Sequence, residues 1–289
     1  MTRIAYLGPA ATFTHQAALK EFGPAEMYLP QRTIPDIFFA VAQGQAEFGV
    51  VPIENSIEGS VTYSQDMFGR KGMEEIKVCD EIYLPIVEHL LTNPAGPQSL
   101  SDIKVVYSHP QAIAQCRIWL YENLPQARLQ EMSSTAAAAQ LAMQEADCAA
   151  VAGQLAAEQY GLRVFRAGIE DADFNQTRFL VISQKDTSFT GHKQGREVTA
   201  LMLSIKDRVG ALHAFSQVML KHNLNMNRIE SRPGKQKAWD YVFFIDFFGH
   251  PADPNVAAAL QELQSETVWV RVLGAWTREA SALKKSEEG

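Results

Sequence analysis

The sequence has little of what marks membrane-spanning and secreted proteins. It contains no run of about 18 apolar residues, the length that a transmembrane helix needs, so no such helix is expected. Its first residues, MTRIAYLGP, are typical of a strand and a turn, with no apolar signal segment before them. Its three cysteines form no CxxC pair and lie far apart, at Cys79, Cys116 and Cys148. This spacing predicts reduced cysteines in a cytoplasmic protein.

Motifs of several enzyme classes are absent as well. The sequence has no GxGxxG or P-loop for a nucleotide, no GxSxG elbow of a serine hydrolase and no HExxH zinc motif, and its seven histidines are scattered. We therefore expect no metal and no cofactor. The formal net charge of −7 argues against a surface built for nucleic acid or anionic membranes. An anionic substrate is still compatible with it, because one arginine outweighs a diffuse negative surface at short range.

The composition that is present is that of an ordinary globular protein, with 46% hydrophobic and 20% charged residues. A length of 289 residues favours two domains over a single core. Near the N-terminus, apolar strand patterns alternate with helix patterns. The strands are Arg3–Gly8 and Ala46–Ile53, and the helices are Thr12–Phe22, capped by Thr12 or Thr14, and Ile34–Gly44. This alternation predicts crossover connections and a largely parallel sheet.

The same alternation returns between Asp80 and Arg166. Residues Lys104–Asn123 are typical of a strand, a turn and a helix, and Ser133–Gly153 of an alanine-rich helix followed by a short strand. We therefore predict an α/β domain with two lobes, in which the segment from Ala167 to Ser183 crosses back to the first lobe. The predicted boundaries are 1–183 for the domain, approximately 1–79 with 167–183 for the first lobe, and 80–166 for the second.

A polar stretch without periodicity, residues 184–197, is typical of a linker. Beyond it the order of patterns is strand, helix, strand, strand, helix, strand, which is the ferredoxin-like βαββαβ arrangement. The six elements are expected at Val198–Lys206, Gly210–Asn223, Leu224–Pro233, Trp239–Gly249, Pro254–Glu266 and Thr267–Trp276, with the turn GKQK between the third and the fourth. A separate domain is predicted over 198–278, followed by a charged tail, 279–289.

Four polar clusters follow predicted strands, at the ends where open α/β sheets bind ligands. The first, GPAATFTH (Gly8–His15), leads into a helix whose N-terminal N–H groups suit a carboxylate, although ordinary turns and caps use the same residues. The second, VPIENSIEGSV (Val51–Val61), contains Glu54, Asn55 and Ser56, which suit a polar small molecule or, equally, a capped turn.

The third cluster is YSHPQAIAQC (Tyr107–Cys116). It places Ser108 and His109 at a strand-to-helix turn, with Gln115 one turn further along and able to point to the same place. His109 precedes a proline, so it is as consistent with a turn residue as with a base.

The fourth cluster is DADFNQTRFLVI (Asp171–Ile182). Arg178 suits bidentate bonds to a carboxylate, and Thr177 beside it offers a hydroxyl donor. Threonine is also a favoured strand residue and arginine a common surface charge, so the cluster by itself leaves both interpretations open.

Together these stretches resemble the prephenate dehydratase family, the enzymes that finish the prephenate route to phenylalanine, over nearly the whole chain. NQTRFLVI resembles the family's Thr-Arg-Phe signature, PIENSIEGSV its Glu-Asn-Ser motif and YSHPQAIAQC its Ser-His-Pro-Gln motif. The C-terminal unit is similar to the ACT regulatory domain, with GALH (Gly210–His213) and IESRPG (Ile229–Gly234) at its phenylalanine-binding motifs. The chain departs from the family pattern at Ala11, where glycine is usual, at Thr14, where serine is commoner, and at His213, where valine is frequent.

The resemblance implies a fold and a set of site residues. The fold is a two-lobed α/β catalytic domain with mainly parallel sheets, like that of periplasmic binding proteins, followed by a ferredoxin-like ACT domain. The implied residues are, for catalysis, Thr177, Arg178, Phe179, Glu54, Asn55, Ser56, Ser108 and Gln115; for substrate binding, Thr12, Phe13 and Asn175; and for effector binding, Gly210, Ala211, Leu212, Glu230, Ser231, Arg232 and Pro233. No cofactor is implied. Because no chorismate mutase segment precedes Met1, the chain resembles the monofunctional form.

The implied reaction removes CO2 and the ring hydroxyl from prephenate to give phenylpyruvate, and L-phenylalanine inhibits it. Thr177 would donate a hydrogen bond to the departing hydroxyl. Arg178 would hold the side-chain carboxylate, since a salt bridge to the ring carboxylate would stabilise the ground state. Phe179 would offer apolar surface to the forming ring. In a regular strand Thr177 and Phe179 share one face and Arg178 the other, a tension that a bulge or an irregular strand start would resolve.

Two other functions stay open. Arogenate dehydratase would perform the same elimination on the amino-acid analogue and needs a partner for an ammonium group, for which Glu54 is suited. A non-catalytic amino-acid sensor also fits a two-lobed α/β fold, although the intact Thr177-Arg178-Phe179 triplet disfavours it. The expected partners are prephenate, L-phenylalanine bound between two ACT domains, and further copies of the chain in a homodimer or homotetramer.

Overall fold

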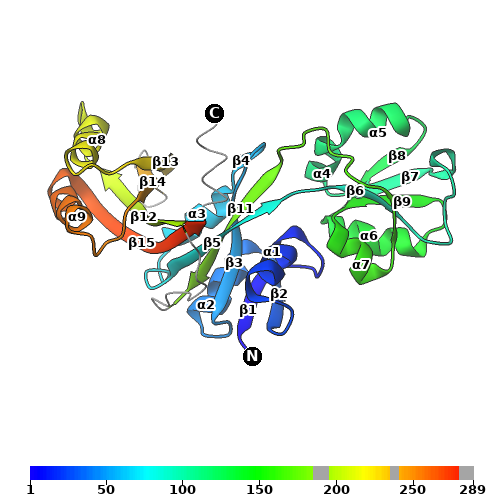
Figure 1. The fold of residues 1–289 in the computed structure, drawn as a ribbon, viewed down its shortest axis with the longest axis horizontal. Coiled ribbons are helices and arrows are strands. Elements are labelled where there is room, and N and C mark those ends of the chain that lie inside the picture. Colours follow the sequence, from blue (N-terminus) through cyan, green and yellow to red (C-terminus); the bar gives the residue numbers. More distant parts are fainter. Residues whose placement is uncertain (185–194, 235–240, 280–289) are drawn as a thin grey trace. The chain divides into compact units, whose positions relative to one another are not determined.

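The computed structural model of the chain describes residues 1–184, 195–234 and 241–279 (Figure 1). Its internal contacts divide the chain into two compact units. The first unit contains Met1–Ile37, Val50–Val61 and Ile82–Phe179, and the second contains Phe38–Gly49, Thr62–Glu81 and the chain from Leu180 onward.

Some predicted segments lie outside the described residues: 185–194 of the predicted linker, the lysines of the GKQK turn and the tail after Glu279. Within the described ranges, no helix combines the length and the apolar character that crossing a membrane requires. The three cysteines are buried free thiols.

The first lobe, which belongs to the first unit for most of its length, follows the predicted alternation of strands and helices. Its elements are β1 (Arg3–Leu7), α1 (Phe13–Phe22), β2 (Met27–Gln31), α2 (Ile34–Ala42), β3 (Phe48–Asn55), β4 (Gly59–Ser60) and the returning strand β11 (Gln176–Ser183). The strand order is β11-β3-β1-β2, with β4 paired to β3. The sequence pattern did not predict β2, because this edge strand is only partly buried and contains Pro30.

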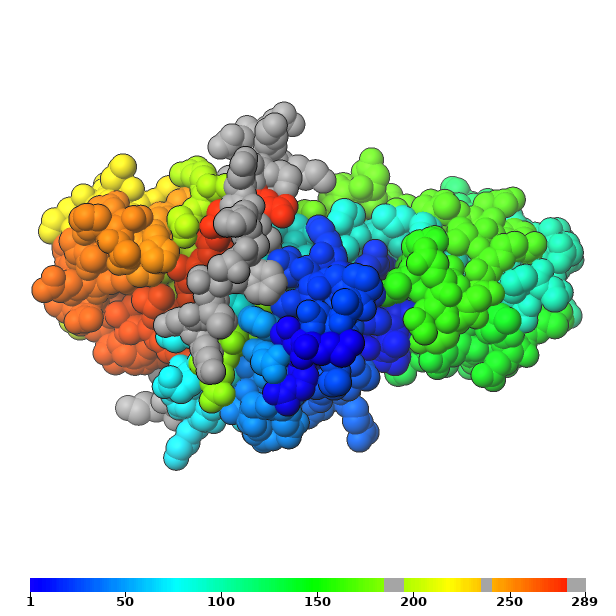
Figure 2. Space-filling model, turned by 60° about the horizontal axis from the view of Figure 1, so that its bottom comes forward, coloured from blue at the N-terminus to red at the C-terminus, as the bar shows by residue number. Residues whose placement is uncertain are grey.

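The second lobe of the first unit is built on a five-stranded sheet of order β10-β6-β9-β7-β8. The strands are β6 (His89–Thr92), β7 (Val105–Ser108), β8 (Arg128–Glu131), β9 (Cys148–Ala152) and β10 (Arg163–Arg166). The helices are the 3-10 helix η1 (Leu100–Asp102), α4 (Pro110–Gln115), α5 (Arg117–Asn123), α6 (Thr135–Gln144) and α7 (Gln154–Tyr160). Figure 2 shows this lobe, coloured mostly green, as one continuous packed body.

The five-stranded sheet is mixed rather than mainly parallel as expected. β7 runs parallel to β8 and β9, as helical crossovers require, whereas β6 is antiparallel to both β9 and β10. β6 is reached by a short connection from β5 (Lys77–Pro85) instead of a helix, so no βαβ unit fixes its direction.

The chain passes between the two lobes twice, and the two passages contact each other. The Ile86 N–H donates to the carbonyl of Asn175, and the Ile169 N–H donates to the carbonyl of Glu88, each at 2.9 Å. The second passage leads into β11, which lies in the sheet of the first lobe. The last part of the segment from Ala167 to Ser183, which forms β11, thus pairs with β3 of the first lobe.

The carboxyl of Glu88 is buried where the passages meet. It is 1% exposed, and its Oε2 has no hydrogen-bond partner among the described residues. Burial, and then the negative charge of Glu170, raises the pKa of Glu88 to about 8. Because this value lies above the ordinary pKa of 4.5, the folded state binds the proton more tightly, and stability is lost as the pH rises from about 4.5 to about 8.

We expect Glu88→Gln, which keeps the shape of the side chain without its charge, to remove the loss of stability at rising pH. The melting temperature of the variant should exceed that of the wild type by a margin that grows from pH 5 to pH 8, corresponding to a few kcal/mol at the alkaline end. Thermal unfolding of both proteins across this range measures the margin, with the exposed Glu122→Gln as the matched control. A margin that does not change with pH would contradict the assignment.

The C-terminal part of the second unit has the predicted βαββαβ order. Its elements are β12 (Gly195–Ile205), α8 (Ala211–Lys221), β13 (Met226–Pro233), β14 (Tyr241–Phe248), α9 (Pro254–Glu266) and β15 (Thr267–Glu279). The strands form an antiparallel sheet of order β13-β14-β12-β15, and α8 and α9 cover one of its faces (Figure 1). β12 begins at Gly195, three residues before the predicted start at Val198.

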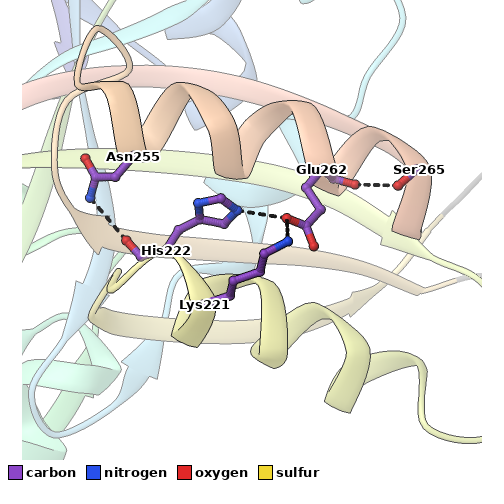
Figure 3. A network of polar contacts seen from close by, with 5 residues as sticks. All are labelled: Lys221, His222, Asn255, Glu262 and Ser265. Carbon is purple, nitrogen blue, oxygen red and sulfur yellow. Dashed lines mark hydrogen bonds and ion pairs between the residues drawn. The ribbon is translucent and has the colours of Figure 1, made fainter.

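A polar network joins the C-terminal end of α8 to α9 (Figure 3). The Nζ of Lys221 and the Nε2 of His222 both lie 2.8 Å from the Oε2 of Glu262. Asn255 donates to the carbonyl of His222 at 3.2 Å, and Ser265 donates to that of Glu262 at 2.8 Å. Lys221, and then His222, lower the pKa of Glu262. Exposed ion pairs add little stability, so the network chiefly sets how the two helices are aligned.

Within the second unit, β15 also contacts β5. Gly274 pairs with Val78, and a Cβ on Gly274 would lie 1.8 Å from the Val78 carbonyl oxygen, so only glycine fits there. Arg278 and Glu81 form a buried bidentate ion pair, with Nε–Oε1 at 2.5 Å and Nη2–Oε2 at 3.0 Å. Arg271 donates at 2.8–2.9 Å to three carbonyls, those of Phe68, Met73 and Ile76.

Candidate active site

The first residues of β11 share a hydrogen-bond network with Asn55, the last residue of β3. The side-chain amide of Asn55 donates to Asn175 Oδ1 at 2.8 Å and to Thr177 Oγ1 at 2.9 Å. All three side chains are buried, with exposures of 6%, 4% and 9% in that order. The Oδ1 of Asn55 accepts from the N–H groups of Ile57 and Glu58, each at 3.0 Å. These two bonds fix which end of the amide faces Thr177.

Asn175 extends the network to the second lobe. Its side-chain nitrogen donates to the Oε1 of Gln115, the last residue of α4, at 2.9 Å. The helix stops at this point because the carboxylate of Asp171 accepts from the N–H groups of Ile118 and Trp119, at 2.9 and 3.0 Å, and so starts a new helix, α5. The single helix that the sequence predicted is therefore split, and the split presents Gln115 to Asn175.

The three residues of the Glu-Asn-Ser motif have different environments. Ser56 binds the start of β11 through three hydrogen bonds. Its backbone N–H donates to the carbonyl of Gln176 at 2.8 Å. Its hydroxyl donates to the carbonyl of Phe174 at 3.1 Å and accepts from the Gln176 N–H at 2.9 Å. Glu54 is half-buried and pairs with Ser60 in the hairpin of β3 and β4. In this structure Ser56 therefore holds the backbone around Asn55.

Thr177 combines burial with an oriented hydroxyl. Its Oγ1 accepts the bond from Asn55, so one of its lone pairs is occupied and its own hydrogen is directed elsewhere. A hydroxyl held in this way is prepared to donate to a group that approaches from its other side.

The Thr-Arg-Phe triplet lies inside a strand, because β11 already begins at Gln176. The pleat therefore directs Arg178 to the face opposite Thr177. Arg178 is 6% exposed and Phe179 is 2% exposed. Phe179 thus belongs to the core in this structure and offers a ligand little surface.

Among the described contacts of the stretch Tyr107–Cys116, it is Gln115, after the Ser-His-Pro-Gln motif, that joins the network. The hydroxyl of Ser108 is fully buried and donates to the carbonyl of Val151 at 2.6 Å, which joins β7 to β9. His109 caps α4, and its Nδ1 accepts from the Gln111 N–H at 3.3 Å. Burial lowers the pKa of His109, which keeps its ring neutral. The interpretation of His109 as a turn residue is the one that these contacts favour.

The first cluster packs against the second lobe. Thr12 caps α1 and donates to the carbonyl of Leu7 at 2.8 Å, so its hydroxyl serves the loop. The ring of Phe13 rests on Gly153, where an added Cβ would lie 2.9 Å from a ring carbon. Ala11 has a φ of 67°, a conformation that glycine adopts more readily than alanine. Among the described contacts, Thr12 and Phe13 do not join the Asn55 network.

The predicted effector residues of β13 fall on two faces of the strand, since exposure alternates along it. The half-buried face carries Glu230 and Arg232. Glu230 accepts from the Nε2 of Gln65 at 2.6 Å, and the Nη2 of Arg232 lies 3.4 Å from the Oδ1 of Asp66. Gln65 and Asp66 belong to α3 (Thr62–Phe68), a helix that the sequence analysis did not predict. The exposed face carries Ser231 and Pro233, which stay open to a ligand.

The other predicted effector residues lie at the N-terminus of α8. Gly210 is its N-cap, with a φ of 80° that glycine adopts without strain. Ala211 is buried and Leu212 is 42% exposed. The Ala211 N–H donates to the carbonyl of Arg208 at 3.2 Å, and the N-terminus of this 11-residue helix is a place that suits a carboxylate. Within the described ranges, no group of three His, Cys, Asp or Glu side chains is arranged to hold a metal ion.

Two protein-family models match successive parts of the chain. The family model of prephenate dehydratase matches residues 4–187, and that of the ACT domain matches residues 199–264. A curated relative, the bifunctional chorismate mutase/prephenate dehydratase of Aquifex aeolicus, is 44% identical over 276 residues, which are 96% of this chain and 74% of the relative.

Two solved structures have the same fold. The prephenate dehydratase of Arthrobacter aurescens in complex with L-Phe is 33% identical with a TM-score of 0.85, over 99% of this chain and 97% of the other. GqqA, described as a novel type of quorum quenching acylase, is 27% identical with a TM-score of 0.84, over 97% of this chain and 99% of the other. The match of the dehydratase model to more than half of the residues shows that the chain belongs to the prephenate dehydratase family.

Proposed function

We propose that the network around Thr177 converts prephenate to phenylpyruvate, with loss of CO2 and of the ring hydroxyl. The observation that carries this proposal is the 2.9 Å bond from Asn55 to Thr177, which occupies an acceptor site of the hydroxyl and leaves its hydrogen to be donated. Membership of the dehydratase family supports the same reaction.

The reaction breaks two bonds of the substrate. The bond between the ring and its carboxylate breaks and releases CO2, its electron pair moves into the ring, and the bond to the hydroxyl breaks on the far side. The hydroxyl is a poor leaving group, so a proton must reach it to complete a molecule of water. Thr177 donates a hydrogen bond to that oxygen as charge develops on it. Because a threonine hydroxyl is a very weak acid, Thr177 acts as a donor or relay, and the net proton comes from another source.

Arg178 is the proposed anchor for the side-chain carboxylate of prephenate. We expect Arg178→Ala to raise KM about 10-fold or more with a smaller change in kcat, because an anchor binds substrate and transition state alike. Steady-state kinetics measures this, and Arg178→Lys tests whether charge alone is sufficient. Because the pleat of β11 directs Arg178 to the face opposite Thr177, the experiment is decisive: if neither KM nor kcat changes, Arg178 anchors no substrate.

The effector of the proposed regulation is L-phenylalanine, the compound that the prephenate dehydratase of Arthrobacter aurescens holds in its complex. We assign its carboxylate to the first turn of α8 and its remaining contacts to the exposed face of β13. β13 is the last strand of its sheet in the described order, and its exposed Ile229 suits pairing with a second copy of the chain. We therefore propose at least a homodimer of the chain.

The test of the proposed function is an assay of the purified chain with prephenate and with arogenate. We expect phenylpyruvate from prephenate, with a higher kcat/KM than for arogenate. A preference for arogenate, which yields phenylalanine directly, would favour arogenate dehydratase. Binding of phenylalanine without turnover of either compound would favour the amino-acid sensor.

A further inference from the structure

Helix α3 contacts the half-buried face of β13 through two polar pairs. Gln65 is fully buried and donates to the carboxylate of Glu230 at 2.6 Å. Asp66 pairs with Arg232 at 3.4 Å, with the two side chains 16% and 25% exposed. Glu230 and Arg232 are two residues apart on one strand, so both point to the same side, toward α3.

This contact leaves two complementary buried atoms unmatched. The Oε1 of Gln65 is an acceptor and the Nε of Arg232 is a donor, and neither has a hydrogen-bond partner within the part of the chain that the structure describes. Buried polar atoms are nearly always paired, and an unpaired one raises the free energy of the arrangement that contains it. A shift of α3 along β13 that brought these two atoms together would satisfy both of them.

Of the two elements in contact, α3 is connected to the proposed active site and β13 to the proposed effector site. On one side, α3 follows directly after the hairpin of β3 and β4, in which Asn55 pairs with Gly59. Ten positions therefore separate Asn55, the donor to Thr177, from Gln65 in the sequence. On the other side, Ser231 lies between Glu230 and Arg232 and points to the opposite face of the strand, where we place the effector.

We propose that Gln65 and Asp66 couple the effector site to the active site, an inference that rests on the proposed function above. A ligand on the exposed face of β13 displaces the strand, changes the pairing of Glu230 and Arg232 with α3, and through the hairpin changes the position of Asn55. The two residues bind neither substrate nor effector, so they are positioning residues. A ligand changes the balance of two arrangements only through its different affinity for them.

The test separates coupling from binding and from catalysis. Gln65→Leu removes both polar atoms of the amide, and Asp66→Asn removes one charge with little change of shape. The matched control is Gln144→Leu, at an exposed glutamine that ends α6. For each protein, initial rates with prephenate are measured over a range of L-phenylalanine concentrations, and calorimetry measures the binding of L-phenylalanine.

We expect Gln65→Leu to keep kcat and KM without effector, and the affinity for phenylalanine, within about threefold of the wild type. The concentration that gives half inhibition should rise about 10-fold, or the maximal inhibition should fall, which is within the usual range of coupling between sites. Asp66→Asn should show a smaller shift in the same direction, and it also covers the case in which Gln65→Leu does not fold. The control should be inhibited like the wild type.

Three outcomes would overturn the inference. Inhibition curves of Gln65→Leu and Asp66→Asn that coincide with the wild-type curve exclude these residues as the coupling. A wild type that turns over prephenate and binds phenylalanine without being inhibited leaves the proposed function of the catalytic domain in place but removes the coupling. A wild type that does not turn over prephenate refutes the proposed function itself, and the coupling with it.

Discussion

Replacing Thr177 by alanine should lower kcat for prephenate by about 100-fold or more while the protein stays folded. The expected loss is the usual contribution of a positioned proton donor. The fold should survive because Asn55, which donates to Thr177, keeps two other acceptors, Asn175 Oδ1 at 2.8 Å and the Gln176 carbonyl at 3.3 Å. No buried donor is therefore left without a partner.

Thr177→Ser is the control for this experiment, because it keeps the hydroxyl and removes only a methyl group. Its kcat should stay well above that of Thr177→Ala. Steady-state rates give kcat and KM for both variants, and thermal unfolding checks that each is folded. Near-normal turnover by folded Thr177→Ala would remove the proposed role of the hydroxyl.

The largest loss of stability is expected from Arg278→Met, at about 3–5 kcal/mol in the free energy of unfolding. The ion pair of Arg278 with Glu81 is almost fully buried, with side-chain exposures of 9% and 2%. Removing the guanidinium takes both charge-assisted bonds from a carboxylate that stays buried, and breaking a buried ion pair in this way costs far more than breaking an exposed one.

The double variant Glu81→Leu/Arg278→Met tests this explanation. Replacing both partners by apolar side chains removes the buried carboxylate together with the guanidinium, so it should recover most of the stability that the single variant loses. Urea unfolding of the wild type and both variants gives the three free energies. A loss below about 1 kcal/mol in the single variant would show that the pair behaves like an exposed one.

The ion pair of Arg278 with Glu81 also makes a truncated chain a poor test of the regulation. A chain cut near Gln184 loses Arg278 together with the strand that contacts β5, and it leaves Glu81 and Val78 without their partners in β15. We therefore expect such a fragment to be destabilised, so that its loss of response to phenylalanine would be ambiguous. Point variants of the full chain, such as those at Gln65 and Asp66, avoid this difficulty.

Local signals in the sequence determined most of the secondary structure. Thr12 caps α1 and Gly210 precedes α8 as predicted, and α9 spans Pro254–Glu266 as predicted. These features depend on hydrogen bonds within one helical turn, so a few neighbouring residues specify them. The sequence motifs also singled out Asn55, Gln115, Asn175 and Thr177, which the fold brings into one network.

Only the tertiary structure decided what the other predicted residues do. Gln65 and Glu230 are 165 positions apart, and nothing near either of them in the sequence indicates that they meet. Phe179 and Ser108 have the types expected of site residues, but their burial assigns them to the core and to a bond between strands. Likewise, burial beside Glu170 is what raises the pKa of Glu88. Burial, charge environment and partners are properties of packed surfaces from distant segments, so they are fixed only when the chain has folded.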